Sequence, residues 1–358
     1  MLRAKQRTSR RSDAARIMQI YEAIVLAPEV TTGGKCVPVL LTADAQVASI
    51  QDRQMKRRVA IIGTGWVGSS VAISTLHSGV ADELLLHDVH QEVAEGEAMD
   101  LAHGASFYPP TMVRTTSIEE MADADAVVVA AGRGGRPGES RLELLRDNAA
   151  VIRDIAQKLR KCRGTIVIVT NPVDVLTHVM TEVSGLPPAR VVGTGTMLDT
   201  ARLKHVVGHA LHVDPHSIHA HVVGEHGDSE VVLWSAARVG GRRLREWAGW
   251  DERREPALAE EVRRAAYEII RRKGATNHAI GLVTADLLRC VLRDERRVLT
   301  LSRVHDGTLG LRNVALSLPV VVGAQGVAEV LEPEMSAAER EQLERSAGVL
   351  RSAALGAL

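Results

Sequence analysis

Three polar residues in the second half of the chain combine a proton carrier, a carboxylate and a guanidinium. His226 lies in the glycine-flanked stretch GEHGDS, and Asp199 and Arg202 lie in MLDTAR. An imidazole titrates near neutral pH and can act as an acid or a base toward an alcohol. Asp199 and Arg202 are three residues apart, so one face of a helix would carry both. A guanidinium fork matches a carboxylate through two parallel N–H donors.

Each of these residues also has an ordinary structural explanation. A lone histidine is more often structural than catalytic, and Asp199 suits a helix cap. Arg202 suits a surface ion pair, which contributes only ~0–1 kcal/mol. Asn171, in TNPVD, suits a turn before Pro172.

A glycine pattern near residue 63 predicts a dinucleotide site. GTGWVG places Gly63, Gly65 and Gly68 after an apolar run and at the opening of a helix. The first glycine permits a tight turn, the second lets the backbone approach a pyrophosphate, and the third lets helix pack on strand. Asp88 ends the next apolar run, where a carboxylate accepts hydrogen bonds from ribose hydroxyls and repels a 2′-phosphate. This favours NAD over NADP, although Asp88 is also compatible with a cap or surface role.

The elements that must position these residues alternate along the chain. The sequence predicts strands followed by helices, which indicates a parallel sheet covered on both faces. The expected fold is therefore α/β, a Rossmann-type doubly wound parallel sheet. The predicted strands are 58–63, 83–89, 126–132, 165–171 and 190–195, and the predicted helices are 67–78, 91–103, 141–161 and 174–184.

The pattern changes after residue 195, where a mixed α+β catalytic domain is expected. The NAD-binding domain is predicted over 55–195 and the catalytic domain over 196–358. The second domain would hold β-like stretches at 217–223 and 230–239, a helical region over 256–293, a hairpin over 297–323 and a helix over 336–353. Residues 1–54 are basic at their start and show no sustained period, so they are expected to be a disordered extension, a transit peptide or the product of a mis-assigned start.

Composition excludes several classes of protein. The 44 Lys and Arg balance the 44 Asp and Glu, which argues against a nucleic-acid or membrane surface. No apolar run reaches the roughly 18 residues that a spanning helix needs. The three cysteines form no CxxC pair, which fits a reducing cytoplasm and neither a disulfide framework nor a zinc site. The fourteen histidines have no spaced acidic or cysteine partners, so no metal is expected.

Seven ordered motifs from about Lys56 onward resemble the lactate/malate dehydrogenases, NAD-dependent L-2-hydroxy acid dehydrogenases, and are closer to the lactate enzymes. The motifs are GTGWVGSSVA, GEAMDLAHG, RPGESRLELLRDN, TNPVDVLTHV, GTMLDTARLKHVVG, GEHGDSE and KGATNHAIG. The resemblance implies that His226 exchanges a proton with the substrate, Asp199 orients it and Arg202 grips the substrate carboxylate.

The resemblance also assigns roles around the substrate and the nicotinamide. It makes Arg141 the arginine of a closing loop that polarises the carbonyl, and it makes Asn171 a donor to the substrate oxygen that also supports the nicotinamide. Thr276 would line the substrate pocket and Ile280 would pack behind the nicotinamide ring. Fructose 1,6-bisphosphate activates some bacterial relatives, and their basic residue and histidine correspond to Lys204 and His219. Because lysine lacks the arginine fork, at most weak activation is expected here.

The substrate side chain is read in this family six residues before the loop arginine, which is Gly135 here. Lactate enzymes have glutamine there, and malate enzymes have arginine to pair a second carboxylate. Glycine disfavours malate, because a buried carboxylate without a partner is costly. It also predicts room for 2-oxo acids larger than pyruvate. A malate enzyme, with Arg133 or Arg136 as the partner, and a non-catalytic NAD-binding structural protein are the alternatives. The family forms homotetramers or homodimers.

Overall fold

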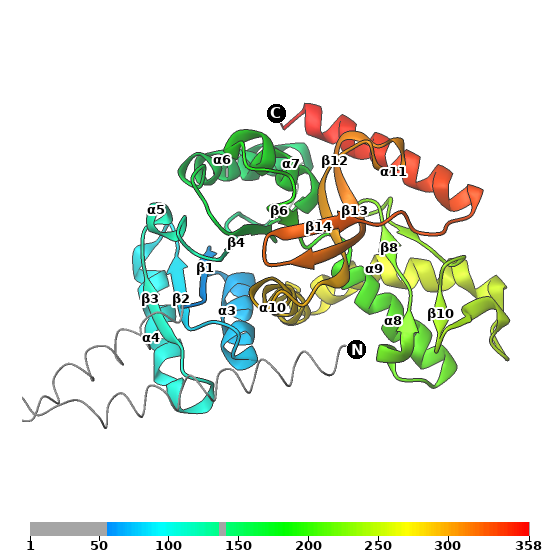
Figure 1. Ribbon diagram of the computed structural model, residues 1–358, viewed down its shortest axis with the longest axis horizontal. Coiled ribbons are helices and arrows are strands. Elements are labelled where there is room, and N and C mark those ends of the chain that lie inside the picture. The colour runs from blue at the N-terminus through cyan, green and yellow to red at the C-terminus, as the bar shows by residue number, and fades with distance from the viewer. Residues whose placement is uncertain (1–55, 136–140, 358) are drawn as a thin grey trace, which may run out of the picture. The chain divides into compact units, whose positions relative to one another are not determined.

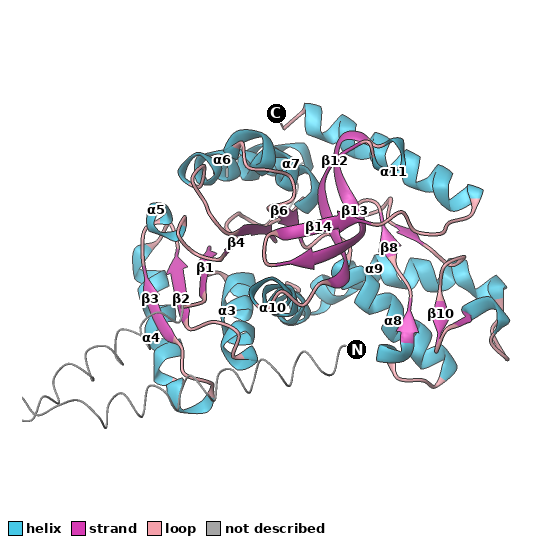
Figure 2. Ribbon diagram, in the orientation of Figure 1, coloured by secondary structure: helices cyan, strands magenta, loops and turns pink. Residues whose placement is uncertain are grey.

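The computed structural model describes residues 56–135 and 141–357. The expectation for residues 1–54 concerns a segment outside this range. One large sheet crosses the described chain, with helices on both of its faces (Figures 1 and 2).

The sheet begins with six parallel strands in the order β3-β2-β1-β4-β5-β6. These strands form because their sequences are short β-branched or leucine-rich runs, such as the fully buried AVVV of β4. The chain starts in the middle of the sheet and winds outward in both directions, as the doubly wound prediction requires. The strands are β1 (Arg58–Ile62), β2 (Glu83–His87), β3 (Met112–Thr115), β4 (Ala126–Val129), β5 (Thr165–Ile168) and β6 (Val191–Gly193).

Side chains of each central strand alternate between two apolar cores. In β1, Val59 and Ile61 face one core, and Ala60 and Ile62 face the other. The first core is completed by α3 (Trp66–Ser78), α4 (Gln91–His103) and α10 (His278–Leu292). The second is completed by α5 (Ile118–Met121), α6 (Arg141–Lys158), α7 (Val173–Ser184) and α11 (Ala337–Leu355). Burial on both faces explains why these strands are apolar throughout.

The second half of the chain extends the same sheet. An antiparallel meander continues beyond β6 in the order β12-β13-β14, formed by Arg297–Asp306, Arg312–Gly323 and Gly326–Val330. A third apolar core lies between α8 (Met197–Leu211), α9 (Glu255–Lys273) and four of five short strands, since both residues of β11 are exposed. These strands are β7 (Ile218–His219), β8 (Val222–Val223), β9 (Val231–Val232), β10 (Arg238–Val239) and β11 (Arg242–Arg243).

The predicted fold class is confirmed, with several local differences, among them the unpredicted α5 and β14. The sequence pattern missed β3, whose residues are only partly buried and carry a weak apolar signal. The single helical region predicted over 256–293 is two helices, α9 and α10, because Gly274 adopts a left-handed conformation that ends α9. The boundary predicted at residue 195 stays a prediction.

Helix α3, which begins at the glycine motif, is packed closely against α10. A side chain at Gly281 of α10 would collide with Ser70 of α3, with its Cβ only 2.6 Å from the backbone oxygen of Ser70. The absence of a side chain therefore lets the two helices approach. This contact fixes α3, and with it the site that α3 opens.

Gly281→Ala should destabilise the protein by about 1–3 kcal/mol, because the added methyl group forces α3 and α10 apart. The measurement is the free energy of unfolding from urea titration. Gly348→Ala is the matched control: Gly348 is also inside a helix, and a Cβ there meets nothing within 4 Å. The control should be neutral or stabilising by roughly 0.5–1 kcal/mol. Equal losses in the two variants would contradict the packing argument.

Candidate active site

One buried carboxylate joins the histidine and the arginine that the sequence singled out. His226 lies in the loop between β8 and β9, and its Nδ1 is 2.5 Å from Oδ2 of Asp199 in the first turn of α8. Arg202, one turn later on that helix, donates from Nη1 to Oδ1 of Asp199 at 2.8 Å. The Asp199 side chain is only 3% exposed. The cap and surface-pair explanations therefore do not describe these residues.

The electrostatics of the pair favour a protonated imidazole. Burial by itself lowers the pKa of His226, but the Asp199 carboxylate outweighs it and raises that pKa to about 9. Burial likewise raises the pKa of Asp199, and the charges of His226 and Arg202 outweigh it and hold the pKa below its usual value. At neutral pH the pair is imidazolium and carboxylate. Because Nδ1 is taken by Asp199, Nε2 is the nitrogen left to face a substrate.

The loop that carries His226 is held by two more helices. The backbone N–H of His226 donates to Oδ2 of Asp174 on α7 at 2.7 Å. The backbone N–H of Glu225 donates to Oγ of Ser346 on α11 at 2.9 Å. Sequence inspection missed both supporting residues. Asp174 had a signal in its motif, three residues after Asn171, whereas Ser346 had none because it lies more than a hundred residues from the loop it holds.

A third carboxyl group near the catalytic pair, Glu230, was also missed. Glu230 is buried, and its Oε1 has no hydrogen-bond partner among the described residues. Burial and then the negative charge of Asp199 raise its pKa to about 8. The raised pKa favours the neutral form of Glu230, which weakens its competition with an anionic ligand for Arg202.

Asn171 lies between β5 and α7, and its surroundings fix the orientation of its amide. Its Oδ1 accepts a hydrogen bond from the backbone N–H of Val173 at 3.3 Å, which leaves Nδ2 as the donor to a ligand. Its backbone oxygen accepts from Nδ2 of Asn148 at 2.9 Å. Oδ1 of Asn148 accepts from the backbone N–H of Arg133 at 3.0 Å. Asn148, on α6, thus links the Asn171 turn to the start of the arginine-rich loop, the stretch GRGGRPGESR over residues 132–141.

The arginine-rich loop is described up to Gly135. A Cβ at Gly135 would meet only Leu144 Cδ2, at an ordinary 3.6 Å, and the backbone there is not left-handed. Glycine at 135 is thus not a requirement of the backbone. Arg133, a possible partner for a second carboxylate, instead pairs with Asp147 at 2.6 Å. Arg141 is the first residue of α6, and its side chain and Arg136 lie outside the described residues.

The remaining predicted pocket residues come from the break between α9 and α10. Thr276 lies in the break itself and is partly buried. Ile280 lies in the first turn of α10 and packs against the core under α3. Both positions follow the Gly274 turn, which brings the start of α10 back toward the sheet.

The three glycines of GTGWVG do three different things in the structure. A Cβ at Gly63, where φ is +94°, would lie 2.6 Å from the backbone of Ala131. A Cβ at Gly68 would collide with the backbone oxygen of Gly63, whereas Gly65 has nothing within 4 Å. Gly63 and Gly68 therefore permit tight packing, and Gly65 leaves open space at the N-terminus of α3, where a pyrophosphate is stabilised.

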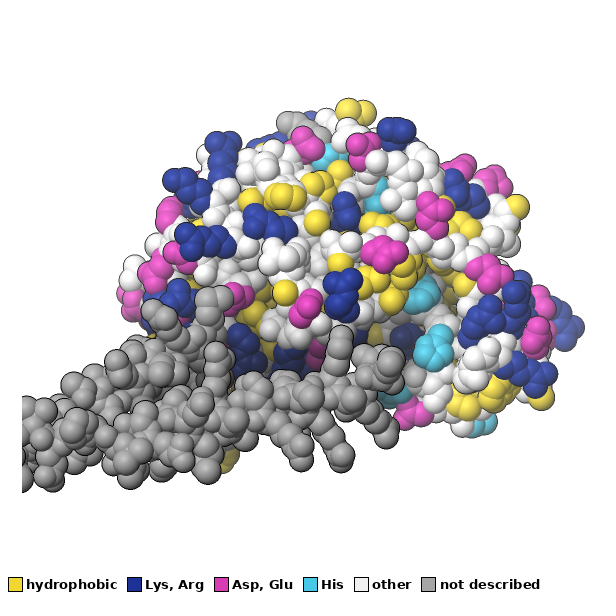
Figure 3. All heavy atoms as spheres, in the orientation of Figure 1, with side chains coloured by type: hydrophobic (Ala, Val, Ile, Leu, Met, Phe, Trp, Pro, Cys, Tyr) yellow, Lys and Arg dark blue, Asp and Glu magenta, His cyan; other side chains and the backbone are white. Residues whose placement is uncertain are grey.

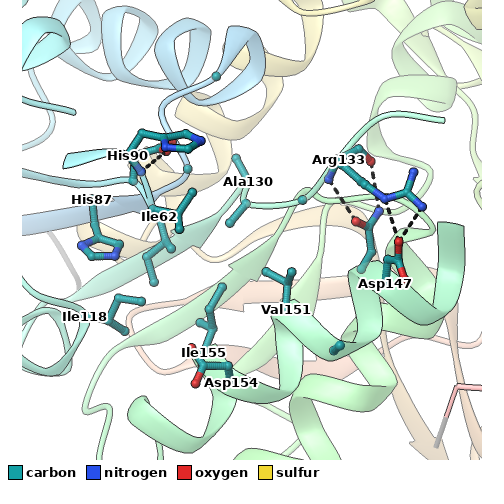
Figure 4. Close-up of a pocket in the computed structure, with 18 of the residues that line it drawn as sticks. Ile62, His87, His90, Ile118, Ala130, Arg133, Asp147, Val151, Asp154 and Ile155 are labelled. Carbon is teal, nitrogen blue, oxygen red and sulfur yellow. Dashed lines mark hydrogen bonds and ion pairs between the residues drawn. The ribbon is translucent and has the colours of Figure 1, made fainter. Parts of the chain in front are cut away.

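A cleft of about 760 Å³ adjoins these glycines (Figure 4). Apolar side chains line much of it, including Ile62, Ile118 and Ile155, which suits an adenine ring. Asp88 also lines the cleft. Its Oδ2 accepts from the backbone N–H of Thr64 at 2.8 Å, and its Oδ1 accepts from that of His90 at 3.0 Å. The carboxylate is thus held at the place where ribose hydroxyls would meet it, so the residues present fit NAD.

Lys204 and His219, the predicted anion pair, lie on different elements. Lys204, on α8, lines a separate cavity of about 330 Å³ together with Arg297 and Asp286. Burial and then the charge of Arg297 lower the pKa of Lys204. His219 is exposed on β7. Among residues 56–135 and 141–357, no group of three or more His, Cys, Asp or Glu side chains is placed to hold a metal ion.

On the face seen in Figure 3, basic and acidic side chains are interspersed. In the part of the chain that the structure describes, every helix is too short or too polar to cross a membrane.

Comparisons with known proteins match nearly all of the described chain. The family model of the lactate/malate dehydrogenase NAD-binding domain matches residues 57–193, and that of the lactate/malate dehydrogenase alpha/beta C-terminal domain matches residues 196–355. The chain is 46% identical to an L-lactate dehydrogenase of Thermus aquaticus, over 83% of this chain and 98% of that protein. It is 45% identical to one of Synechococcus sp. (strain JA-3-3Ab), over 82% and 96% of the two chains.

Solved structures give the same result. The ligand-bound crystal structure of minor L-lactate dehydrogenase from Enterococcus mundtii has a TM-score of 0.81 at 39% identity, covering 84% of this chain and 98% of the other. MGS-M5, a lactate dehydrogenase from a Medee basin deep-sea metagenome, has a TM-score of 0.82 at 35% identity, covering 84% and 99%. By fold and by sequence, the chain belongs to the lactate/malate dehydrogenase family, whose N-terminal domain binds NAD.

Proposed function

We propose that the protein is an NAD-dependent L-lactate dehydrogenase that interconverts pyruvate and lactate and also accepts larger 2-oxo acids. The observation that carries the proposal is the Asp199 carboxylate, bound by His226 on one oxygen and by Arg202 on the other. This arrangement places a proton donor and a carboxylate clamp side by side. A 2-oxo acid has a carbonyl and a carboxylate on adjacent carbons, and so fits both.

The residues divide the work of pyruvate reduction. NADH, when bound, would supply the hydride for the carbonyl carbon and would be left as NAD⁺. Nε2–H of His226 gives its proton to the carbonyl oxygen, and Asp199 stabilises the imidazolium before that transfer. Arg202 holds the carboxylate, and Asn171 donates to the carbonyl oxygen. Arg141, where the closing loop joins α6, polarises the same carbonyl and helps to exclude water. In lactate oxidation the neutral His226 takes the proton back.

The same residues support two alternative functions less well. A malate enzyme needs a cation for the second carboxylate, but residue 135 is glycine and Arg133 is paired with Asp147. A non-catalytic NAD-binding protein would have no physical reason to bury Asp199 between two cations, since a buried ion pair is weak evidence for stability alone.

The assembly, location and regulation are part of the same proposal. We infer a homotetramer or homodimer, because large apolar side chains stay exposed, among them Phe107 at 83% and Trp66 at 63%. Buried free thiols at Cys162 and Cys290 suit the reducing cytoplasm. Lys204 and His219 stay a predicted site for a sugar bisphosphate, with at most weak activation expected.

His226→Asn should abolish turnover, with a loss of about 10²–10⁴-fold or more in kcat, because the amide cannot transfer the proton. NADH binding should stay within about twofold, since His226 lies outside the adenosine cleft. Pyruvate reduction by the unchanged enzyme should fall as pH rises through about 9, where His226 loses its proton. Steady-state kinetics and NADH fluorescence titration check these results. Full activity in His226→Asn would overturn the assignment.

A panel of 2-oxo acids with NADH tests the open pocket at Gly135. The expected result is that kcat/KM for 2-oxobutyrate and for branched or aromatic 2-oxo acids stays comparable to that for pyruvate. Gly135→Gln should narrow this range, and Gly135→Arg should raise kcat/KM for oxaloacetate by supplying the missing cation. A steep fall beyond pyruvate in the unchanged enzyme would show that the pocket is closed, and a preference for oxaloacetate would favour the malate alternative.

Asp88→Ser tests the choice of cofactor. Removal of the carboxylate should lower kcat/KM for NADH by about 10-fold or more and raise it for NADPH, because the repulsion of a 2′-phosphate is relieved. Asp154→Asn is the matched control. Asp154 lines the same cleft but pairs with Lys158 at 3.0 Å, so its loss should leave the NADH to NADPH ratio unchanged. The role of Asp88 is refuted if the two variants behave alike.

A further inference from the structure

The start of the arginine-rich loop runs along one side of α6. The backbone N–H of Arg133 donates to Oδ1 of Asn148 at 3.0 Å, and Nδ2 of Asn148 donates to the backbone oxygen of Arg133 at 3.2 Å. Two residues further along the loop, the Cβ position of Gly135 lies 3.6 Å from Cδ2 of Leu144. The loop and the helix therefore run in opposite directions here, with Arg133 beside Asn148 and Gly135 beside Leu144.

Leu144 differs from the other apolar residues of this helix in its surroundings. Leu145 and Ile152 are buried in the apolar core beneath α6, whereas Leu144 is partly exposed and belongs to none of the three described cores. Residues four apart share a helix face, so Leu144 lies one turn before Asn148 on the side that meets the loop. Its side chain therefore borders the space that glycine leaves open in the loop.

In the proposed function, on which this inference rests, residue 135 lies beside the side chain of the 2-oxo acid. A side chain at this residue would project toward Leu144, since apart from its chain neighbours no other described heavy atom lies within 4 Å of its Cβ position. With glycine at 135, the side chain of the substrate can extend in this direction and meet the leucine instead. The group that it meets is a methyl group, which favours contact with carbon and gives no hydrogen bond to an amide or a carboxylate.

We propose that Leu144 forms an apolar wall of the pocket for the substrate side chain, and that the enzyme prefers 2-oxo acids with a branched apolar side chain to polar ones of the same shape. Gly135 provides the volume, and Leu144 decides which side chains are stable in it. The two properties are separable, because a change of polarity at Leu144 leaves glycine at 135. The same wall disfavours oxaloacetate, whose second carboxylate would lose water against a methyl group while Arg133 is paired with Asp147.

Two substrates of nearly the same outline test this preference with the full-length enzyme and NADH. The apolar probe is 4-methyl-2-oxopentanoate, and the polar probe is 2-oxosuccinamate, which has an amide where the first has an isopropyl group. In the unchanged enzyme, kcat/KM should be about 10-fold or more higher for the apolar probe. Leu144→Asn should lower this ratio by about 10-fold or more, because the leucine is replaced by an amide that can hydrogen-bond the polar probe.

Leu142→Asn is the matched control, with the same substitution on the same helix. Leu142 is 46% exposed, and its Cδ1 lies 3.3 Å from the Cβ position of Gly356, so it faces the residue that follows α11. The ratio of this variant should equal that of the unchanged enzyme. Leu144→Met should keep the preference, because the side chain stays apolar and adapts its shape. Since each ratio is taken within one variant, a loss of stability or of NADH affinity cancels from it.

The outcomes separate this inference from the proposed function. If the unchanged enzyme reduces no 2-oxo acid with NADH, the proposed function fails, and the inference fails with it. If it reduces pyruvate but shows no preference for 4-methyl-2-oxopentanoate over 2-oxosuccinamate, the inference alone is refuted. It is also refuted if Leu144→Asn leaves the ratio unchanged, or if Leu142→Asn lowers the ratio equally. Should Leu144→Asn fail to fold, Leu144→Gln applies the same test with a better helix former.

Discussion

The Asp199 carboxylate is the constraint on which the site depends. It is almost completely buried, and a buried anion is tolerated only when its partners are close and well oriented. His226 and Arg202 are those partners, one on each oxygen. The requirement fixes the tautomer of the imidazole and the direction of the guanidinium at once. Removing either cation would leave a buried charge, so the geometry is resistant to local relaxation.

The fold places this carboxylate close to the carboxyl edge of the parallel sheet, at the start of α8. Asp199 lies in the first turn of α8, which is separated by three residues from the end of β6, the last parallel strand, so α8 starts at the carboxyl edge of the sheet. The His226 loop is then fastened to α7 through Asp174 and to α11 through Ser346. Ligands bind at the carboxyl edge of such sheets, where loops from several strands converge. Because three helices hold one loop, small displacements of the loop meet resistance from each side.

The sequence alone was sufficient to predict those elements and residues that a short, continuous pattern marks. The strands β1, β2, β4, β5 and β6, the glycine motif and the residues of the quoted motifs were all found from short patterns. β3 was missed because its side chains are only partly buried, so its four residues lack an apolar run. Asp174, Ser346 and Glu230 could not be assigned, because their importance arises from contacts across many residues. A carboxylate in TNPVD looks like a helix-capping residue until its oxygen is seen at the backbone of His226.

Gly135 shows how position and packing must be considered together. Several glycines of this chain are required by the backbone: a Cβ at Gly63 would collide with Ala131. Gly135 is different, because its Cβ position is open apart from an ordinary contact with Leu144. A larger residue would fit there without strain, so the fold does not select glycine. In the proposed function residue 135 lies beside the substrate, and glycine there leaves volume that a side chain would otherwise fill. In the proposed function, space at residue 135 sets the substrate preference, whereas the acid–base chemistry is assigned to Asp199, His226 and Arg202.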